Sequence, residues 1–421
     1  MKKIAVIGAG ASGMMAAIAA AENARVSLFD KNDIPGRKLL QTGNGKCNFL
    51  NESDPVPHFR GSIADSGILS GIFESYDRDR ILGLFFSFGL LYHKKNGGYY
   101  PRSDSAASLN DVLIGVMKER EVIFHPQIQV KGIEKKGDQF FLDLFHLKHN
   151  KRSKDETPFD AVIVATGGKA APKTGSTGDG YYFAEGFGLS VAKPLPALTR
   201  LLSPDPFFND NTVRASVSVK LFIDDSFTAA SQGELQVNAG GPSGICIFDL
   251  SGRAARALNE GRSCRISVDF LPELDVEELF SLLLRKAERI GAEDPPSSLF
   301  NGIFSDRLSV NICEKLENLL FKGRSFHGIL SDSLIRDIAV LIKDMSFDIS
   351  GTGEFAISQV TSGGITAESL NPDLSAKNVP GLFFTGECLD ADGDCGGFNL
   401  HWAWASGLTA GFAASGAVVC F

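Results

Sequence analysis

The stretch KKIAVIGAGASGMMAAIAAAENARVSLFD, residues 2–30, decides the fold. A short apolar run ends at Gly8, helix-forming residues follow, and a second strand-like run ends at Asp30. An apolar run that stops at glycine is typical of a buried parallel strand. Because strand, helix and strand fit into about thirty residues, the stretch has the size of a βαβ unit. It therefore predicts the start of a Rossmann-type α/β domain.

Gly8, Gly10 and Gly13 form the pattern G-x-G-x-x-G at the turn between the first strand and the helix. The first glycine permits the tight turn, the second lets a pyrophosphate approach the backbone, and the third lets the helix pack closely on the strand. The helix N-terminus then faces the anion. Asp30 stands where a carboxylate accepts hydrogen bonds from a ribose. The combination predicts dinucleotide binding, with NAD(P) and FAD both open.

Two later runs also have the character of buried strands. FDAVIVATGG, residues 159–168, and GLFFTGE, residues 381–387, are apolar and end in glycine turns. Neither opens a second G-x-G-x-x-G. We therefore expect both to join the N-terminal strands, which makes the dinucleotide-binding domain discontinuous, with residues 1–192 and 355–421.

The segment between these halves has a different pattern. Residues 193–274 contain strand-like runs separated by turn residues, which predicts a β-rich unit that also includes residues 345–354. Residues 275–344 carry apolar residues at helical spacing, and Asp275 and Ser331 stand where helix caps are expected. The predicted fold class is α/β, a Rossmann-type FAD-binding or NAD(P)-binding domain with an inserted β-rich unit and a small helical unit.

The charge balance limits the partners. The chain has 42 Lys and Arg residues against 50 Asp and Glu residues, a formal net charge of −8. Broad binding to nucleic acid or to an anionic membrane needs a basic surface. We therefore expect no nucleic-acid partner and no membrane partner, while a local basic pocket and any oligomeric state stay open.

The ends of the chain and its cysteines predict a cytoplasmic protein. Glycines interrupt the apolar N-terminal run, where a signal peptide would be continuous helix. The C-terminal residues 402–421 are rich in Gly, Ala and Ser and lack a basic flank, which favours a helix buried in protein over a membrane span. The seven cysteines form no CxxC pair, so we expect reduced thiols and no metal site.

GRKLLQTGNGKCN, residues 36–48, contains GNGK but does not fit the phosphate loop of nucleotide hydrolases. That loop places four residues between its first glycine and Gly-Lys, and then Ser or Thr for Mg²⁺. Here only Asn44 separates Gly43 from Gly45, and Cys47 stands in place of the hydroxyl. We therefore assign the stretch to the pyrophosphate and ring of the dinucleotide.

Several of these strings together resemble a known family. RKLLQTGNGKCN, TGGKAAPKTGSTGDGY, VTSGGI and GLFFTGECLDADGDCGGFNLHWAWASG look like the BaiN-type flavoproteins, which include aminoacetone-oxidase-like proteins and have the fold of the glutathione-reductase superfamily. The resemblance runs over nearly the whole chain. The family usually has Glu at the position of Asp30, often Arg at Lys46, and a Thr-His pair that this chain lacks. The resemblance implies a non-covalently bound FAD.

The resemblance also implies which residues bind the FAD. Gly8 to Gly13 would carry the pyrophosphate, Asp30 the adenosine ribose, and Val130 would place its backbone against the adenine. The turn at 396–400 would start a helix aimed at the pyrimidine side of the flavin, whose reduced form bears negative charge. The full predicted set is Gly8, Gly10, Ala11, Ser12, Gly13, Asp30, Lys31, Arg37, Lys38, Gly43, Asn44, Gly45, Lys46, Cys47, Asn48, Val130, Thr166, Gly167, Gly386, Glu387, Gly397, Phe398, Asn399 and Leu400.

Two residues are candidates for chemistry beyond cofactor binding. His401 follows the glycine turn on the predicted helix, where its ring can face the flavin. Cys47 lies where the predicted cradle meets the flavin, with no second cysteine near it in sequence. A lone histidine is more often structural, and a lone cysteine more often fills a small buried space.

The predicted function is an FAD-dependent oxidoreductase that acts on an unidentified small organic substrate. The cofactor carries the redox step, and the protein binds and orients it. NAD(P)H is a possible electron donor. Two alternatives stay open: an oxidase that passes electrons to O₂, and a flavoprotein with an RNA-linked or structural role.

Overall fold

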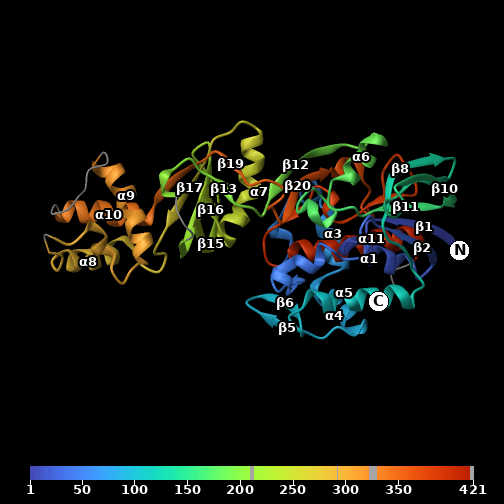
Figure 1. Ribbon diagram of the computed structural model, residues 1–421, viewed down its shortest axis with the longest axis horizontal. Coiled ribbons are helices and arrows are strands. Elements are labelled where there is room, and N and C mark those ends of the chain that lie inside the picture. Colours follow the sequence, from blue (N-terminus) through green and yellow to red (C-terminus); the bar gives the residue numbers. More distant parts are fainter. Residues whose placement is uncertain (209–212, 292, 322–329, 418–421) are drawn as a thin grey trace. The chain divides into compact units, whose positions relative to one another are not determined.

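The computed structural model describes residues 1–208, 213–291, 293–321 and 330–417. The chain divides into two compact units: unit 1 is Met1–Pro196 with Phe355–Phe421, and unit 2 is Ala197–Glu354. In Figure 1 the blue N-terminal and the red C-terminal elements lie together in unit 1, and unit 2 is yellow to orange. The chain therefore leaves unit 1 once and returns to it. A further division of the inserted segment at residue 275 stays a prediction.

Unit 1 is built on a five-stranded parallel sheet in the order β21-β11-β1-β2-β7. The register aligns Ile4 of β1 with Ala161 of β11 and Val26 of β2. Side chains on both faces of β1 are buried from Ile4 onward, as expected for a parallel strand covered on two sides. The strands are β1 (Lys2–Ile7), β2 (Ala24–Phe29), β7 (Ile123–His125), β11 (Ala161–Val164) and β21 (Leu382–Phe384).

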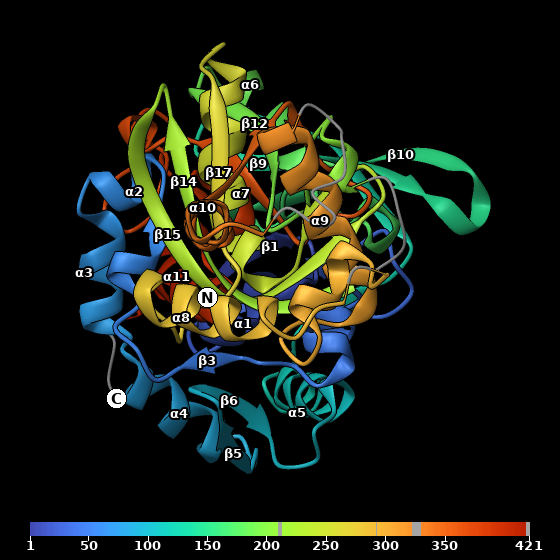
Figure 2. The ribbon, with the colours of Figure 1, turned by 90° about the vertical axis from the view of Figure 1, so that its left-hand side faces the viewer.

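Strands β1, β2, β11 and β21 confirm the strand-like runs predicted within residues 2–30, 159–168 and 381–387, and the sheet confirms the predicted α/β fold class. Strand β7 was not predicted. The remaining strands of unit 1 form small sheets of two or three strands, and the β5–β6 hairpin lies beside α5 (Figure 2). These elements are α1 (Ala11–Ala20), β3 (Leu50–Asn51), β4 (Phe59–Arg60), α2 (Ser62–Asp65), α3 (Ile68–Ser75), α4 (Arg78–Ser87), β5 (Tyr92–Lys95), β6 (Gly98–Pro101), α5 (Ala106–Glu119), β8 (Ile128–Lys136), β9 (Gln139–His146), β10 (Lys151–Phe159), α6 (Asp179–Gly186), β12 (Val191–Ala197), β20 (Val360–Ile365), β22 (Asp392–Gly393) and α11 (Phe398–Ser415).

Helix α11 packs directly on α1, which explains the small residues of the C-terminal segment. A Cβ atom added at Gly407 would lie 2.6 Å from the Ser12 carbonyl oxygen, and one added at Gly411 would lie 2.5 Å from that of Ala16. Fourteen of the eighteen residues of α11 are buried, as predicted for a helix inside protein. Within the described ranges, no helix combines the length and apolar character that a membrane span requires. The last residues of the 402–421 segment, with Cys420, lie outside the described part of the chain.

Unit 2 contains a five-stranded antiparallel sheet in the order β16-β15-β14-β17-β18 together with four helices among its described residues. Asp275 and Ser331 cap helices as predicted, because their side chains accept hydrogen bonds from the amides of Glu278 and Leu334. The elements are β13 (Leu201–Leu202), β14 (Val213–Ile223), β15 (Ser226–Asn238), β16 (Gly241–Ser243), α7 (Ile245–Asn259), β17 (Cys264–Asp269), α8 (Val276–Ala287), α9 (Asp306–Phe321), α10 (Asp332–Lys343), β18 (Met345–Ile349) and β19 (Gly351–Thr352).

Helix α7 was not predicted from the sequence. Three of its first four residues, Ile245, Ile247 and Phe248, are β-branched or aromatic and favour a strand locally. The helical pattern emerges only over all fifteen residues, which pack one apolar face on β14 and β15. Tertiary packing thus decides this element against its local propensity.

The fit of α11 against α1 can be tested with Gly411→Ala. Because the added methyl group would overlap the Ala16 carbonyl, we expect the free energy of unfolding to fall by about 1–3 kcal/mol. Chemical denaturation measures this change. Gly115→Ala in α5 is the matched control, since a Cβ there meets no atom within 4 Å and alanine favours helix. Equal stabilities for the two variants would contradict the close packing.

Candidate cofactor and active site

Gly8, Gly10 and Gly13, the three glycines of the first βα turn, have different roles. A Cβ at Gly13 would lie 1.8 Å from the Gly8 carbonyl oxygen, and one at Gly8 would lie 2.4 Å from that of Ala165. These two positions are therefore dictated by close packing of α1, β1 and β11. A Cβ at Gly10 would meet no atom within 4 Å. The space in front of Gly10, at the N-terminus of α1, is open in the way that an approaching phosphate requires.

Asp30 is tied to this turn by its carboxylate. The two oxygens accept hydrogen bonds from the amides of Ala9, at 2.6 Å, and Asn32, at 2.7 Å. Burial raises the pKa of the Asp30 carboxyl, and the two amides act against that rise. The carboxylate therefore holds the end of β2 beside the glycine turn. Each oxygen retains a lone pair, which leaves the predicted contact with a ribose chemically possible.

Three buried polar atoms, two of them at the carboxyl edge of the sheet, have no hydrogen-bond partner among the described residues. They are Thr166 Oγ1, after β11, Thr385 Oγ1, after β21, and Asn48 Oδ1. A buried polar group without a partner destabilises a fold by about 1–3 kcal/mol. The carboxyl ends of parallel strands are where open α/β sheets bind ligands. These atoms, with the open space at Gly10, fit a polar dinucleotide such as FAD.

The loop at residues 36–48, called the basic loop below, is bonded to the turn after β21. Lys38 Nζ lies 2.5 Å from Glu387 Oε2, and the Thr361 amide donates to Glu387 Oε1 at 3.0 Å. Gly386 lies against Ser12, because a Cβ there would approach Ser12 Oγ to 2.3 Å. The glycine turn (Gly8–Gly13), the basic loop and the turn at Thr385–Glu387 are far apart in sequence and lie next to one another in the structure. The charge of Lys38 is balanced by Glu387. Lys38 was predicted to offset phosphate charge, and the ion pair with Glu387 competes with that role.

The second half of the basic loop meets the start of α11. Asn51 Nδ2 donates to the Gly396 carbonyl at 2.8 Å. A Cβ at Gly397 would lie 2.8 Å from the Leu50 carbonyl oxygen. The loop backbone is left-handed at Gly43, Asn44 and Cys47, and η1 (Leu39–Gly45) is kinked there. Lys46 is exposed and Cys47 buried on this turn. The two segments predicted to face the flavin therefore adjoin each other.

The other predicted residues are more spread out. Lys31 pairs with Asp179 of α6 at 2.9 Å, and the exposed Arg37 lies near Asp33 at 3.6 Å. Val130 is buried on β8 and lines a cavity of about 500 Å³ to which Asp179 also contributes. Asp179 and Thr361 were missed by sequence reasoning, although TGSTGDGY and VTSGGI contain them. The assignment of the whole set to FAD contacts stays a prediction.

Cys47 and His401, the two candidates for chemistry, are both held neutral by burial. Burial raises the pKa of the Cys47 thiol to about 12, so the reactive thiolate is disfavoured at neutral pH. Burial lowers the pKa of His401 to about 4. Its Nε2 lies 3.0 Å from the Tyr76 carbonyl oxygen, and its ring packs on Phe73. This geometry gives His401 a structural role, as a neutral donor to a backbone carbonyl.

Comparison with known proteins gives a consistent result. Residues 2–413 match the family described as HI0933-like protein Rossmann domain. The chain is 33% identical, over 99% of each chain, to the 3-dehydro-bile acid delta(4,6)-reductase of Clostridium scindens. It is 29% identical, over 95% of each chain, to the ribosomal RNA dihydrouridine synthase of Escherichia coli, and 26% identical to the Haemophilus influenzae protein of that name.

Among solved structures, the chain is similar to a 3-ketosteroid delta1-dehydrogenase from Sterolibacterium denitrificans, with a TM-score of 0.51 and 12% identity over 99% of this chain and 100% of that one. It is also similar to a flavocytochrome c3 fumarate reductase, with a TM-score of 0.50 and 17% identity over 99% of this chain and 78% of that one. At these identities the likeness concerns the fold, and it agrees with the predicted fold class.

Gly10→Val tests the open space at the first turn. The two methyl groups would occupy the volume that a pyrophosphate needs, while the Cβ itself meets no protein atom within 4 Å. We expect the variant to lose FAD and to keep the circular-dichroism spectrum and melting behaviour of the FAD-free wild-type protein. Flavin absorbance after gel filtration measures the loss. Wild-type FAD content in the variant would contradict the assignment of this turn.

Because burial lowers the pKa of His401, we expect the protein to lose stability in mild acid. The unfolded chain takes up a proton near pH 6.5 and the folded chain near pH 4, so unfolding is favoured as the pH falls through this window. The slope is at most about 1.4 kcal/mol per pH unit. His401→Gln keeps an amide donor for Tyr76 but cannot titrate. Denaturation at several pH values should therefore show a shallower acid slope for the variant, and identical slopes would contradict the neutral assignment.

Proposed function

The chain belongs to the HI0933-like Rossmann family and is an FAD-dependent oxidoreductase of the BaiN type, and from this premise we propose that it reduces a carbon–carbon double bond conjugated to a carbonyl group. The observation that carries the proposal is a chemistry common to the curated relatives. A delta(4,6)-reductase of a 3-dehydro bile acid adds hydrogen to double bonds that are conjugated to a ketone. A dihydrouridine synthase saturates a ring double bond beside a carbonyl.

The residues that would hold FAD come from both halves of unit 1. Gly10 and the α1 N-terminus would bind the pyrophosphate, and Asp30 the adenosine ribose. The 43–48 turn and residues 397–400 would adjoin the flavin ring. When bound, FAD supplies two-electron transfer to and from carbon. The buried hydroxyls of Thr166 and Thr385 support this arrangement, because a polar cofactor would provide the partners they lack among the described residues.

The protein contributes fixed dipoles to this chemistry. The eighteen-residue helix α11 begins at Phe398, and its N-terminus carries partial positive charge. Negative charge next to such a terminus is stabilised by about 0.3–1 kcal/mol at an exposed site, and by more where the site is buried. A helix that begins beside the flavin would favour the two-electron reduced form of the cofactor. Cys47, as a neutral thiol, contributes packing on the turn rather than a nucleophile.

NAD(P)H is proposed as the electron donor and a small molecule as the acceptor. The net charge of −8 supports a small acceptor over a polyanion. The second candidate acceptor is uridine in ribosomal RNA. The similarity of the chain to two ribosomal RNA dihydrouridine synthases supports this candidate. Both candidates present the same reacting unit, a double bond conjugated to a carbonyl. They differ in the surface needed around the site.

The experiment measures anaerobic oxidation of NADH and NADPH by the FAD-loaded protein with three acceptors. These are a 3-oxo-4,6-diene steroid, a 3-oxo-4-ene steroid and ribosomal RNA transcribed without modification. We expect turnover with a steroid, a saturated product in mass spectrometry, and no dihydrouridine in the RNA. Dihydrouridine formation without steroid turnover would favour the RNA candidate. Turnover of a reduced donor only when O₂ is admitted would contradict the proposal and favour an oxidase.

A further inference from the structure

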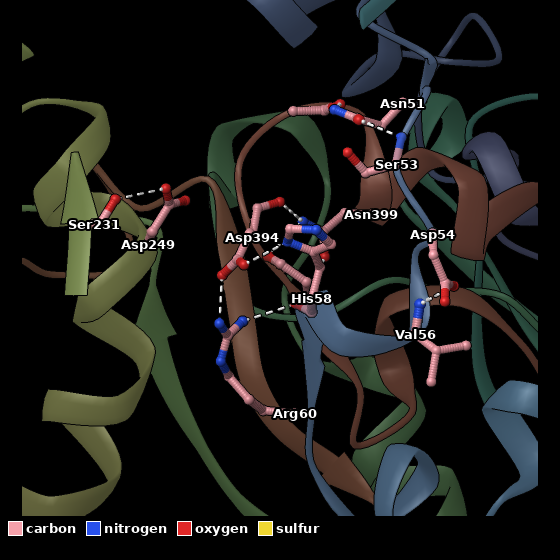
Figure 3. A network of polar contacts seen from close by, with 12 residues as sticks. Asn51, Ser53, Asp54, Val56, His58, Arg60, Ser231, Asp249, Asp394 and Asn399 are labelled. Atoms are coloured by element: carbon pink, nitrogen blue, oxygen red, sulfur yellow. Dashed lines mark hydrogen bonds and ion pairs between the residues drawn. The ribbon is translucent and has the colours of Figure 1, made fainter. Parts of the chain in front are cut away.

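A compact cluster of His58, Arg60 and Asp394 lies in unit 1 (Figure 3). Strand β4 pairs with β22, which aligns Arg60 with Asp392 and brings Asp394 beside His58. His58 Nδ1 lies 2.9 Å from Asp394 Oδ2, and Arg60 Nη2 lies 2.5 Å from Asp394 Oδ1. Arg60 also donates to the His58 carbonyl at 2.8 Å. The carboxylate is thus held from two sides.

The imidazole ring is fixed next to the start of α11. It stacks on Phe398, with ring centroids 4.1 Å apart and an interplanar angle of 16°. Phe398 directly follows Gly397, the turn proposed to adjoin the flavin. The Asn399 side chain accepts from the Gly393 amide at 2.9 Å and donates to the Gly393 carbonyl at 2.8 Å, which fixes the turn that carries Asp394. The cluster is therefore rigid where it meets the proposed site.

One ring nitrogen of His58 is available to exchange a proton with a substrate. Because Asp394 occupies Nδ1, the free position is Nε2, for which the described residues offer no partner. The His58 side chain is 35% exposed, whereas His401 is 2% exposed and bonded to a backbone carbonyl. A carboxylate that orients an imidazole and stabilises its charged form is the usual arrangement for a histidine that transfers protons.

We infer that His58 donates the proton in the proposed reduction and that Asp394 and Arg60 are positioning residues; the inference rests on the proposed function. FAD, when bound and reduced, would supply a hydride for the β carbon of the conjugated substrate. The π electron pair of the double bond would then move toward the carbonyl and give an enolate. The proton on His58 Nε2 then passes to the enolate and completes the saturated carbonyl compound. His58 is left neutral and regains a proton from water.

Separate half-reactions test this role. The FAD of wild-type protein and of His58→Gln is reduced anaerobically with dithionite and then mixed with one of two acceptors in a stopped-flow instrument. The 3-oxo-4,6-diene steroid requires a proton, whereas ferricyanide accepts electrons alone. We expect His58→Gln to slow reoxidation by the steroid by about a hundredfold or more. Reoxidation by ferricyanide should stay within about twofold, because no proton reaches that acceptor.

Two further variants control for structural effects. Asp394→Asn keeps the shape of the side chain and should lower the limiting rate with the steroid about tenfold, with the half-saturating steroid concentration and the ferricyanide rate unchanged. His93→Gln removes the imidazole of another His–Asp pair of unit 1, in which His93 Nε2 lies 2.8 Å from Asp104 Oδ1. It should match the wild type in both half-reactions. Melting curves and FAD content establish that each variant is folded and loaded.

A binding measurement gives a readout independent of turnover. 4-Nitrophenolate resembles an enolate, and its absorbance reports its ionisation. We expect the oxidised FAD-loaded wild-type protein to bind it about tenfold or more tightly than the His58→Gln variant does, since the variant lacks the imidazole that would donate to the anion. Equal binding together with equal steroid reoxidation of wild type and His58→Gln would overturn the inference alone. Failure of the steroids to reoxidise the wild-type protein would overturn both the proposed function and this inference.

Discussion

Helix α1 and strand β1 approach each other so closely that no side chain fits between Gly13 and the Gly8 carbonyl. This contact sets the N-terminus of α1 at the carboxyl edge of the sheet, beside Asp30 and the ends of β11 and β21. It also fixes the outer face of α1, on which Gly411 of α11 packs. Since α11 starts at Phe398, its position carries the second half of the site. One close approach of backbone therefore orients both helix N-termini toward the region proposed for FAD.

Several charged and titratable groups in this region are either paired or kept neutral. Lys38 with Glu387, and Lys31 with Asp179, form ion pairs between segments distant in sequence. Burial keeps Cys47 and His401 neutral, because a charged form would lose its hydration. The cluster around His58 contrasts with them, since it is partly exposed and organised by a carboxylate. Burial and pairing thus separate residues that hold the site together from one that can exchange protons.

The comparisons connect this geometry to chemistry at two levels. Solved structures that share below 20% identity with the chain share its fold, and a fold of this kind hosts many reactions. The curated relatives are similar over nearly their whole length, yet their names describe a steroid-like acid and an RNA base. A double bond conjugated to a carbonyl is common to both substrates. The proposed function therefore keeps one reacting unit and leaves the surface around the site to select between a small molecule and an RNA base.

The sequence by itself determined the βαβ start, four of the five parallel strands, the helix caps at Asp275 and Ser331, and the glycine turn, because periodicity, glycine spacing and capping are local signals. It also determined the family and its cofactor through strings such as 36–48. Tertiary structure alone decided that Lys38 meets Glu387, 349 residues later, and that His58 meets Asp394, 336 residues later. Such pairs have no local signature, since folding of distant segments creates them. Burial likewise decided that His401 is neutral, and the solvent exposure of a side chain is a property of the packed fold rather than of its neighbours in sequence.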